Sequence, residues 1–381
     1  MRACWLVLDS VGCGAAPDAA DFGDVGADTL GHLFEREGLE LPYLASLGLY
    51  EIMRGHSRVV PEALPLRPGA AACRMTERSL GKDTTTGHWE LAGVVIDQPL
   101  ATFERYPADF IDELEKRSGV KFLGNVAASG TEILDRLGEA HCLTGMPILY
   151  TSADSVLQIA AHEEMFGLDR LLRLCEQARE LLDEKGLRVG RVIARPFLGR
   201  SAEHFQRTPN RRDYSLLPPI TVLDELCAAG VRVLGVGKIS DIFAGRGLTE
   251  SHPTKSNLAG MKMTERLWQQ CGDRDSLIVV NLVDFDMLYG HRRDPKGYAQ
   301  ALREFDQWLG QWLTQVGEGE LVCITADHGN DPYHQGTDHT REQVPLLTLH
   351  SPCQLKEGSD FTQVAHLLRQ YFLRSKPGGG K

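Results

Sequence analysis

The sequence has 381 residues, of which 42% are hydrophobic and 24% are charged, a composition typical of a folded globular protein rather than a disordered chain. This length favours two or three domains, or one large core with an insertion. Lys and Arg number 41 and Asp and Glu number 52, and the net charge of −11 leaves no broad basic surface for nucleic acid or an anionic membrane. An anionic substrate would therefore need local cations, a metal or oriented backbone amides.

The nine cysteines are scattered, odd in number and without CxxC pairs, which argues against a disulfide framework and favours a reduced, cytoplasmic location. The first apolar run, Ala3–Leu8, is too short for the apolar core of a signal peptide. No stretch of about 18 apolar residues occurs, so we expect no helix that spans a membrane. The Gly-rich segment 375–381 is predicted to be frayed.

Ala3–Leu8 is predicted to be a buried strand, because it is short and apolar at successive positions. Asp9 follows it directly, and a loop with Gly12 and Gly14 comes next. Two glycines after a strand can belong to a dinucleotide-binding loop, but the spacing here is not GxGxxG, and Pro17 with the acid after it opposes a helix that carries a pyrophosphate. We therefore expect an acidic strand end here and no nucleotide site.

The segment Gly81–Glu90 places three consecutive threonines, Thr84, Thr85 and Thr86, before a sequence that can begin a helix. Threonine at this position often acts only as a helix cap. The same hydroxyls lie among free backbone N–H groups at the positive end of a helix dipole. Beside a metal site, a threonine hydroxyl here would be a nucleophile toward phosphorus, so both roles stay open for this run.

The chain changes character from about Pro99 to Pro219, where no strand-end acid pattern occurs. The segment contains an amphipathic helix, predicted over Asp169–Lys185. Its apolar face consists of Leu171, Leu172, Leu174, Cys175, Ala178, Leu181 and Leu182. We interpret 99–219 as an inserted α+β domain, with a discontinuous core of 1–98 and 220–381.

Arginines gather in this insertion although the protein as a whole is acidic. They are Arg191 and Arg195 in one motif, and Arg207, Arg211 and Arg212 in a second. Arginine pairs bidentately with phosphate oxygens, and it is also an ordinary solvated surface residue. Neither role is excluded, and Arg211 and Arg212 stay ambiguous.

Three later apolar runs end as the first one does, with charged residues. Val231–Gly237 precedes Lys238, Leu277–Val283 precedes Asp284 and Asp286, and Leu321–Ala326 precedes Asp327 and His328. Amphipathic stretches such as Ala299–Trp312 lie between these runs. The alternation predicts an α/β fold with a doubly wound parallel sheet, in which ligands gather beyond the carboxyl ends of the strands.

Carboxylates and imidazoles accumulate at these strand ends. The residues are Asp9, Asp284, Asp286, His291, Asp327, His328, Asp331, His334, Asp338 and His339. Mixed ligands of this kind suit Mn²⁺, Zn²⁺ or Fe²⁺ better than Ca²⁺. Six or so ligands exceed what one tetrahedral ion takes, so we predict two ions about 3.5–4 Å apart. Any single acid–histidine pair could instead be an ordinary surface loop.

These motifs resemble the phosphopentomutase family of the alkaline phosphatase superfamily, nearly from end to end of the chain. The matching segments are Asp9–Asp18, Gly26–His32, Gly81–Glu90, Tyr150–Ser155, Arg191–Pro196, Arg207–Arg211, Gly237–Asp241, Val283–Asp286, Tyr289–Arg293, Ala326–Asn330 and Gly336–Thr340. The strand-end pattern is shared across the superfamily, whereas the long motifs in the insertion are specific to the mutase.

The resemblance implies an alkaline-phosphatase-like core with a cap domain, and two Mn²⁺ ions per chain. The matching metal ligands are Asp9, Asp286, His291, Asp327, His328 and His339, and Asp284 is not among them. Thr84 matches the phosphorylated nucleophile, but the family often has a different residue between the first and third threonine, so Thr85 and Thr86 are not excluded. The positions around the sugar phosphate match Ser152, Asp154, Arg191, Arg207 and Lys238.

The implied reaction interconverts ribose 1-phosphate and ribose 5-phosphate, and the 2-deoxy pair, through a phosphothreonine and a 1,5-bisphosphate. A sugar bisphosphate would be the activator, pentose phosphates the substrates, and no nucleic acid or membrane a partner. A phosphatase or phosphodiesterase of the superfamily would share the metals and the threonine but needs no second phosphate pocket. A cofactor-independent phosphoglycerate mutase uses a serine, and a metal-stabilised binding protein needs no nucleophile.

Overall fold

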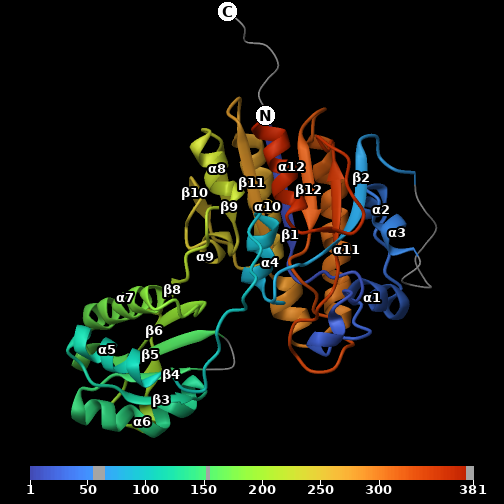
Figure 1. The fold of residues 1–381 in the computed structure, drawn as a ribbon. Helices are drawn as coiled ribbons and strands as arrows, with labels where there is room; N and C mark the ends of the chain where they lie inside the picture. Colours follow the sequence, from blue (N-terminus) through green and yellow to red (C-terminus); the bar gives the residue numbers. More distant parts are fainter. Residues whose placement is uncertain (55–64, 152–154, 375–381) are drawn as a thin grey trace, which may run out of the picture. The chain divides into compact units, whose positions relative to one another are not determined.

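The computed structural model describes residues 1–54, 65–151 and 155–374. The chain divides into two compact units, one formed by Met1–Gln98 with Pro218–Lys381 and the other by Pro99–Leu217 (Figure 1). We call them unit 1 and unit 2. The predicted roles of catalytic core for 1–98 with 220–381 and of cap for 99–219 stay predictions.

Unit 1 is built on an eight-stranded sheet with β1 (Arg2–Leu8) near its centre. In spatial order the strands are β10 (Glu250–His252), β9 (Arg232–Val236), β11 (Ser276–Leu282), β1, β12 (Leu321–Thr325), β13 (Val344–Leu349), β2 (Ala70–Thr76) and β14 (Ser359–Asp360). The first five are parallel, and β13 runs antiparallel to both of its neighbours. Every residue of β11 and β12 is buried, as expected for parallel strands covered on both faces.

Helices cover both faces of this sheet, so the predicted doubly wound α/β fold is confirmed. On one face α12 (Gln363–Phe372) packs against α8 (Val222–Ala228) and α4 (Thr84–Leu91), and on the other α10 (Asn257–Gln270) packs against α11 (Pro295–Trp312) (Figure 1). The shorter elements are η1 (Ala19–Phe22), α1 (Thr29–Glu37), α2 (Pro42–Ser46), α3 (Leu49–Met53), α9 (Ile239–Ile242), η4 (Phe285–Gly290) and η5 (Leu313–Gln315).

The elements predicted from apolar patterns are present in unit 1. Strands expected at Ala3–Leu8, Val231–Gly237, Leu277–Val283 and Leu321–Ala326 are β1, β9, β11 and β12. The amphipathic stretch at Ala299–Trp312 lies within α11. All nine cysteines are free thiols, as predicted.

Unit 2 has its own six-stranded sheet, with helices on both faces. Its strands lie in the order β3 (Leu123–Ala127), β4 (Ile148–Thr151), β5 (Val156–His162), β6 (Arg191–Leu198) and β7 (Gln206–Arg207), and β8 (Arg212–Ser215) also pairs with β6. One apolar cluster joins the sheet to α5 (Ala108–Ser118) and α7 (Leu168–Glu184), and a second joins it to α6 (Gly130–Thr144). Two short turns, η2 (Glu163–Gly167) and η3 (Ala202–His204), complete the unit.

The alternation of side chains along β5 explains how one sheet serves two cores. Leu157 and Ile159 belong to the cluster beneath α5 and α7, whereas Ala160, which points the other way, belongs to the cluster beneath α6. The helix predicted over Asp169–Lys185 is confirmed as α7, and the larger of the two clusters contains most of its predicted apolar face. The segment 375–381, predicted to be frayed, lies outside the described residues. Within the described ranges, no helix is both long enough and apolar enough to cross a membrane.

Gly87 in α4 permits a close contact with the end of β12. A Cβ atom at this position would lie 2.1 Å from the main-chain oxygen of Asp327. Because a backbone atom cannot turn aside as a side chain can, we expect Gly87→Ala to lower the free energy of unfolding by about 1–3 kcal/mol, measured by urea denaturation.

Gly317→Ala is the matched control, since the nearest atom to its added Cβ would be a Glu320 carboxylate oxygen at 3.4 Å. We expect this control to change the free energy of unfolding by less than about 0.5 kcal/mol. Equal effects of the two substitutions would contradict the tight contact between α4 and β12.

Candidate metal centre and active site

The first group of candidate metal ligands lies at the carboxyl ends of two neighbouring strands. Asp9 follows β1, and Asp327 and His328 follow β12, so the parallel pairing of these strands brings the three side chains together. All three are buried, and their ligand atoms lie within 4.8 Å of one another. Asp9 Oδ1 and Asp327 Oδ2 are buried and accept no hydrogen bond, although an imidazole nitrogen lies near each of them, His328 Nε2 at 3.5 Å from Asp9 Oδ1 and His88 Nδ1 at 3.1 Å from Asp327 Oδ2. A divalent cation would satisfy both oxygens.

The charges of this first group also fit a cation. Burial raises the pKa of Asp9, and the neighbouring carboxylate of Asp327 raises it further. Burial opposes the ionisation of Asp327 as well, but His328 and His88 hold the pKa of Asp327 at about 2. Two buried carboxylates that repel one another in this way are stabilised by a positive ion between them.

The second group consists of Asp286, His291 and His339, and it depends on a wide helical turn. Asp286 belongs to the π-helical turn η4, and the His291 amide donates to the Asp286 carbonyl oxygen over 3.0 Å. A turn of this width sets residues five apart side by side, with His291 Nε2 3.2 Å from Asp286 Oδ2. His339 Nε2 lies 3.5 Å from Asp286 Oδ1.

The two imidazoles of the second group turn their Nε2 atoms toward each other, 3.1 Å apart. His291 Nδ1 lies 2.7 Å from the Thr337 carbonyl oxygen, and His339 Nδ1 lies 2.9 Å from the Lys82 carbonyl oxygen. A carbonyl only accepts, so each Nδ1 carries the hydrogen, and in the neutral ring each Nε2 presents a lone pair. Two lone pairs and a carboxylate that converge in this way fit a divalent metal ion.

Thr84 lies beside these groups, at the first position of α4. Its hydroxyl oxygen is 3.2 Å from His328 Nε2, and the His328 ring stacks on that of His339 with 3.9 Å between centroids. The two ligand groups are therefore adjacent. Thr84, which the family resemblance implies is the nucleophile, lies next to the first ligand group.

The other two threonines of the run have different surroundings. Asp83, not a threonine, caps α4, because its carboxylate accepts from the amides of Thr85 and Thr86 over 3.0 and 3.1 Å. The Thr86 hydroxyl is buried and lies 2.9 Å from the same carboxylate. The capping role that the sequence left open for the threonines thus belongs to Asp83, which also occupies two of the backbone N–H groups expected to be free.

Asp284 and Asp331 belong to neither ligand group. Asp284 accepts from the Asn257 amide over 2.7 Å, and Asp331 lies 2.6 Å from His32 Nδ1. Lys238 follows β9, and its charge opposes the effect of burial, which raises the pKa of Asp284. Ser152 and Asp154 lie outside the described residues.

The two predicted phosphate-binding arginines lie in unit 2. Arg191 begins β6, is half-exposed, and lies 3.6 Å from an Asp213 carboxylate oxygen. Arg207 lies over Gly130 at the first turn of α6, where an added Cβ would meet its guanidinium, and it lines a cavity of about 240 Å³. Arg211 pairs with Asp213 over 2.6 Å, which accounts for one of the two arginines that the sequence left ambiguous.

Several residues that hold the ligands in place had no role in the sequence interpretation. The sequence did contain a signal for each of them. His88 and Asn330 lie inside the family-like motifs Gly81–Glu90 and Ala326–Asn330, and the polar Asn281 interrupts the apolar run of β11. Asn330 Nδ2 donates to Asp286 Oδ1 over 2.8 Å, and Asn281 Nδ2 donates to Asp9 Oδ2 over 3.0 Å. His88 Nδ1 donates to the Thr84 carbonyl oxygen over 2.8 Å and lies 3.1 Å from Asp327 Oδ2. Such contacts orient ligands and tune the site.

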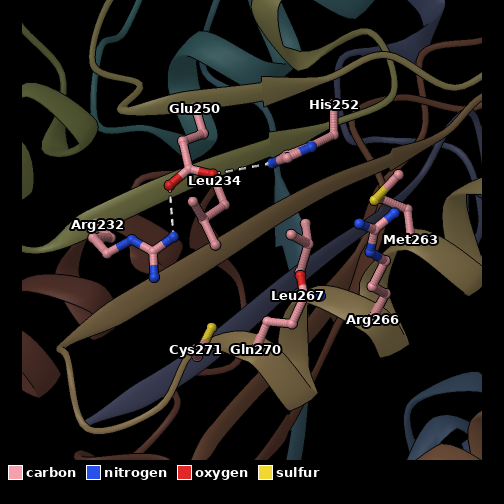
Figure 2. Close-up of a pocket in the computed structure, with 9 residues that line it drawn as sticks. All are labelled: Arg232, Leu234, Glu250, His252, Met263, Arg266, Leu267, Gln270 and Cys271. Carbon is pink, nitrogen blue, oxygen red and sulfur yellow. Dashed lines mark hydrogen bonds and ion pairs between the residues drawn. The ribbon is translucent and has the colours of Figure 1, made fainter.

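A separate cavity of about 280 Å³ lies at the β10 edge of the sheet (Figure 2). Its polar wall is formed by Glu250, which pairs with Arg232 at 2.5 Å and lies 3.5 Å from His252 Nε2. Leu234 and Leu267 contribute apolar surface. Neither Thr84 nor any residue of the two ligand groups lines this cavity, so we do not assign the active site to it.

The doubly wound fold, with two groups of carboxylate and imidazole ligands at its strand ends, defines a protein of the metal-dependent enzyme class. A family model described as the metalloenzyme superfamily matches residues 1–375. The chain therefore belongs to the metalloenzyme superfamily.

Solved structures resemble the protein at low sequence identity. A protein from Pyrococcus horikoshii is 15% identical with a TM-score of 0.51, over 99% of both chains. A phosphoglycerate mutase from Leishmania mexicana is 12% identical with a TM-score of 0.48, over 96% of this chain and 95% of that one. The alkaline phosphatase of the Antarctic bacterium TAB5 is 10% identical with a TM-score of 0.39, over 98% of both chains. The first likeness shows a shared fold, and the other two fall below a TM-score of 0.5.

We expect each chain to hold two divalent ions, and Asp327→Asn to hold fewer, because it removes a charged ligand from the first group. Exhaustive chelation should lower the melting temperature, since the buried carboxylates then repel one another without compensation. Elemental analysis and thermal denaturation measure both effects. Asp109→Asn is the control, because Asp109 lies in unit 2 with 73% of its side chain exposed, and among the described residues it forms an ion pair only with Lys185. Two ions retained by Asp327→Asn, or no metal in the unmodified protein, would contradict the assignment.

Proposed function

We propose that the protein is a phosphopentomutase, which interconverts ribose 1-phosphate and ribose 5-phosphate and the corresponding 2-deoxyribose phosphates. The observation that carries the proposal is the position of Thr84 Oγ1, 3.2 Å from His328 Nε2 at the meeting of the two ligand groups. The Arg-bearing motifs of unit 2, which resemble those of the mutase family, support this substrate class. Mn²⁺ is the proposed metal, and a sugar bisphosphate the proposed activator.

The six residues of the two ligand groups would hold the ions. Divalent cations bound there would supply positive charge for phosphoryl oxygens and for the oxygen of Thr84. The ligands are Asp9, Asp327 and His328 in the first group, and Asp286, His291 and His339 in the second.

Thr84 carries the phosphoryl group between the two positions of the sugar. In the first step the bond from phosphorus to Thr84 Oγ1 breaks as a bond forms to the free hydroxyl of a pentose monophosphate, which loses its proton. This produces a pentose 1,5-bisphosphate and an ionised Thr84. In the second step Thr84 Oγ1 attacks the other phosphate, the bond from phosphorus to the sugar oxygen breaks, and that oxygen takes up a proton. The proton released by the sugar hydroxyl in the first step is matched by the proton taken up by the sugar oxygen in the second, and the enzyme is returned to its phosphorylated form.

A mutase must also hold the phosphate that is not being transferred. In an acidic chain this needs placed cations, and Arg191, Arg207 and Lys238 are the candidates. Arg207 at the first turn of α6 combines a guanidinium with a helix N-terminus, both of which favour an anion. We propose that unit 2 acts as a cap that binds this phosphate and limits the access of water to phosphorylated Thr84.

A phosphatase of the same superfamily is the principal alternative, because it would use the same ligands and the same threonine. The two functions differ in the fate of the phosphoryl group, which a phosphatase gives to water. Parallel assays of ribose 5-phosphate formation and of inorganic phosphate release, both with Mn²⁺, separate them. Phosphate release without isomerised product would reject the mutase.

Thr84→Ala is expected to abolish mutase activity, because it removes the hydroxyl that lies 3.2 Å from His328 Nε2. Thr85→Ala should retain activity within about tenfold of the unmodified protein, since its loss removes no group from the phosphoryl-transfer path. Peptide mapping after incubation with a sugar bisphosphate should find phosphate on Thr84. Phosphate on Thr85 or Thr86 would assign the nucleophile to a different member of the run.

Arg191→Ala is expected to lower mutase turnover efficiency by about ten- to hundredfold, the loss of one charge-assisted phosphate contact. It should also raise the ratio of released phosphate to isomerised product, because a loosely held bisphosphate leaves phosphorylated Thr84 open to water. Arg117→Ala is the matched control, since Arg117 lies in unit 2 and pairs with Glu184 on its surface. An unchanged rate and ratio in Arg191→Ala would place the second phosphate elsewhere.

A further inference from the structure

We infer that Arg341 is a positioning residue, which fixes the segment before Thr84 in register with the second ligand group. Arg341 lies two residues beyond His339 and has only 2% of its surface exposed. Among the described residues, the Arg341 side chain forms no hydrogen bond or ion pair with any of the six candidate metal ligands, so its role is to place the reacting group rather than to react. Only the kinetic part of this inference rests on the proposed function.

The guanidinium of Arg341 is surrounded by acceptors from two distant parts of the chain. On one side Nη2 lies 2.9 Å from Asp18 Oδ2, and on the other Nη1 lies 2.7 Å from Glu77 Oε2. It also donates to three main-chain carbonyl oxygens, those of Glu77, Ser79 and Gly81. The planar guanidinium reaches acceptors on both of its sides at once, with Nη1 shared among Glu77 Oε2 and the carbonyl oxygens of Ser79 and Gly81, whereas the compact ammonium group of lysine cannot span this set.

These carbonyls belong to the segment that leads directly into α4 and Thr84. The segment is held at its next residue as well, because the Lys82 carbonyl oxygen accepts from His339 Nδ1 over 2.9 Å. Asp24 Oδ2 connects Arg341 and Lys82 directly, since it accepts from the Arg341 amide over 2.8 Å and from Lys82 Nζ over 3.0 Å. The backbone from Glu77 to Lys82 is thus tied to the loop that carries His339 and Arg341.

The consequence is a fixed distance between the hydroxyl of Thr84 and the ligand groups. Without the guanidinium, the carbonyls of Ser79 and Gly81 would lose a buried donor, and the segment would relax toward other partners. A displacement of about 1 Å in a reacting group can lower a rate by about a hundredfold. Substrate binding, which the proposed function assigns to other residues, would be much less affected.

Arg341→Lys tests this inference with two independent measurements. Hydrogen–deuterium exchange should become faster in the peptide that contains residues 79–86, and remain unchanged in peptides from β1 and β11. With Mn²⁺ and ribose 1-phosphate, kcat should fall by about 10- to 100-fold while KM changes by less than about threefold. Glu77→Gln is a second variant, which leaves the arginine in place, and it should produce the same changes at a smaller size.

Arg369→Lys is the matched control, because Arg369 forms a bidentate ion pair with Glu225 in the same unit, with both distances 2.7 Å. It should leave the exchange of residues 79–86 and the kcat unchanged. Unchanged exchange in both Arg341→Lys and Glu77→Gln would overturn the inference, as would a fall in kcat fully explained by lost metal or unfolded protein. If the unmodified protein has no mutase activity but the exchange result holds, the proposed function fails and the positioning role stands.

Discussion

The structure depends on one constraint, which is that carboxylates and imidazoles converge beyond the ends of β1, β11 and β12, and that the carboxylates among them are buried. Parallel pairing brings Asp9 and Asp327 together whether or not their charges favour it. An unpaired buried charge costs several kcal/mol. The strands that carry these residues must therefore be stable enough to hold them, and the complete burial of β11 and β12 on both faces provides that stability.

This constraint also explains which parts of the site could be predicted from sequence. A short apolar run followed by an acid predicts a strand end, and parallel strand ends meet at one edge of a sheet. The same pattern could not by itself separate Asp286 from Asp284, two residues away. The structure separates them through the π-helical turn, whose backbone hydrogen bond joins residues five apart, so that Asp286 lies beside His291 and Asp284 pairs with Asn257. Apolar periodicity carries no signal for so rare a turn.

Other features escaped prediction because their partners lie far away in sequence. Arg341 contacts Asp18, which is separated from it by 323 residues, and no local pattern indicates a buried arginine. The cap of α4 illustrates a different limit. Aspartate and threonine are both good capping residues, so the run from Asp83 to Thr86 offered several caps of similar propensity. Only the backbone geometry shows that Asp83 takes this role.

The directions in which the first side chains of α4 point also bear on which threonine is the nucleophile. Successive residues of a helix point about 100° apart, so three consecutive threonines cannot share one environment. With Asp83 as cap and Gly87 against Asp327, the hydroxyl of Thr84 lies at His328 and that of Thr86 at Asp83.

A phosphatase would need this same arrangement of the threonine and the ligand groups. Under the proposed function, unit 1 would account for phosphoryl transfer to and from threonine, whereas the preference for a sugar acceptor over water would come from residues that hold a second phosphate. Arg191 and Arg207 belong to unit 2, so the feature that separates a mutase from a hydrolase is expected in the insertion and not in the metal centre.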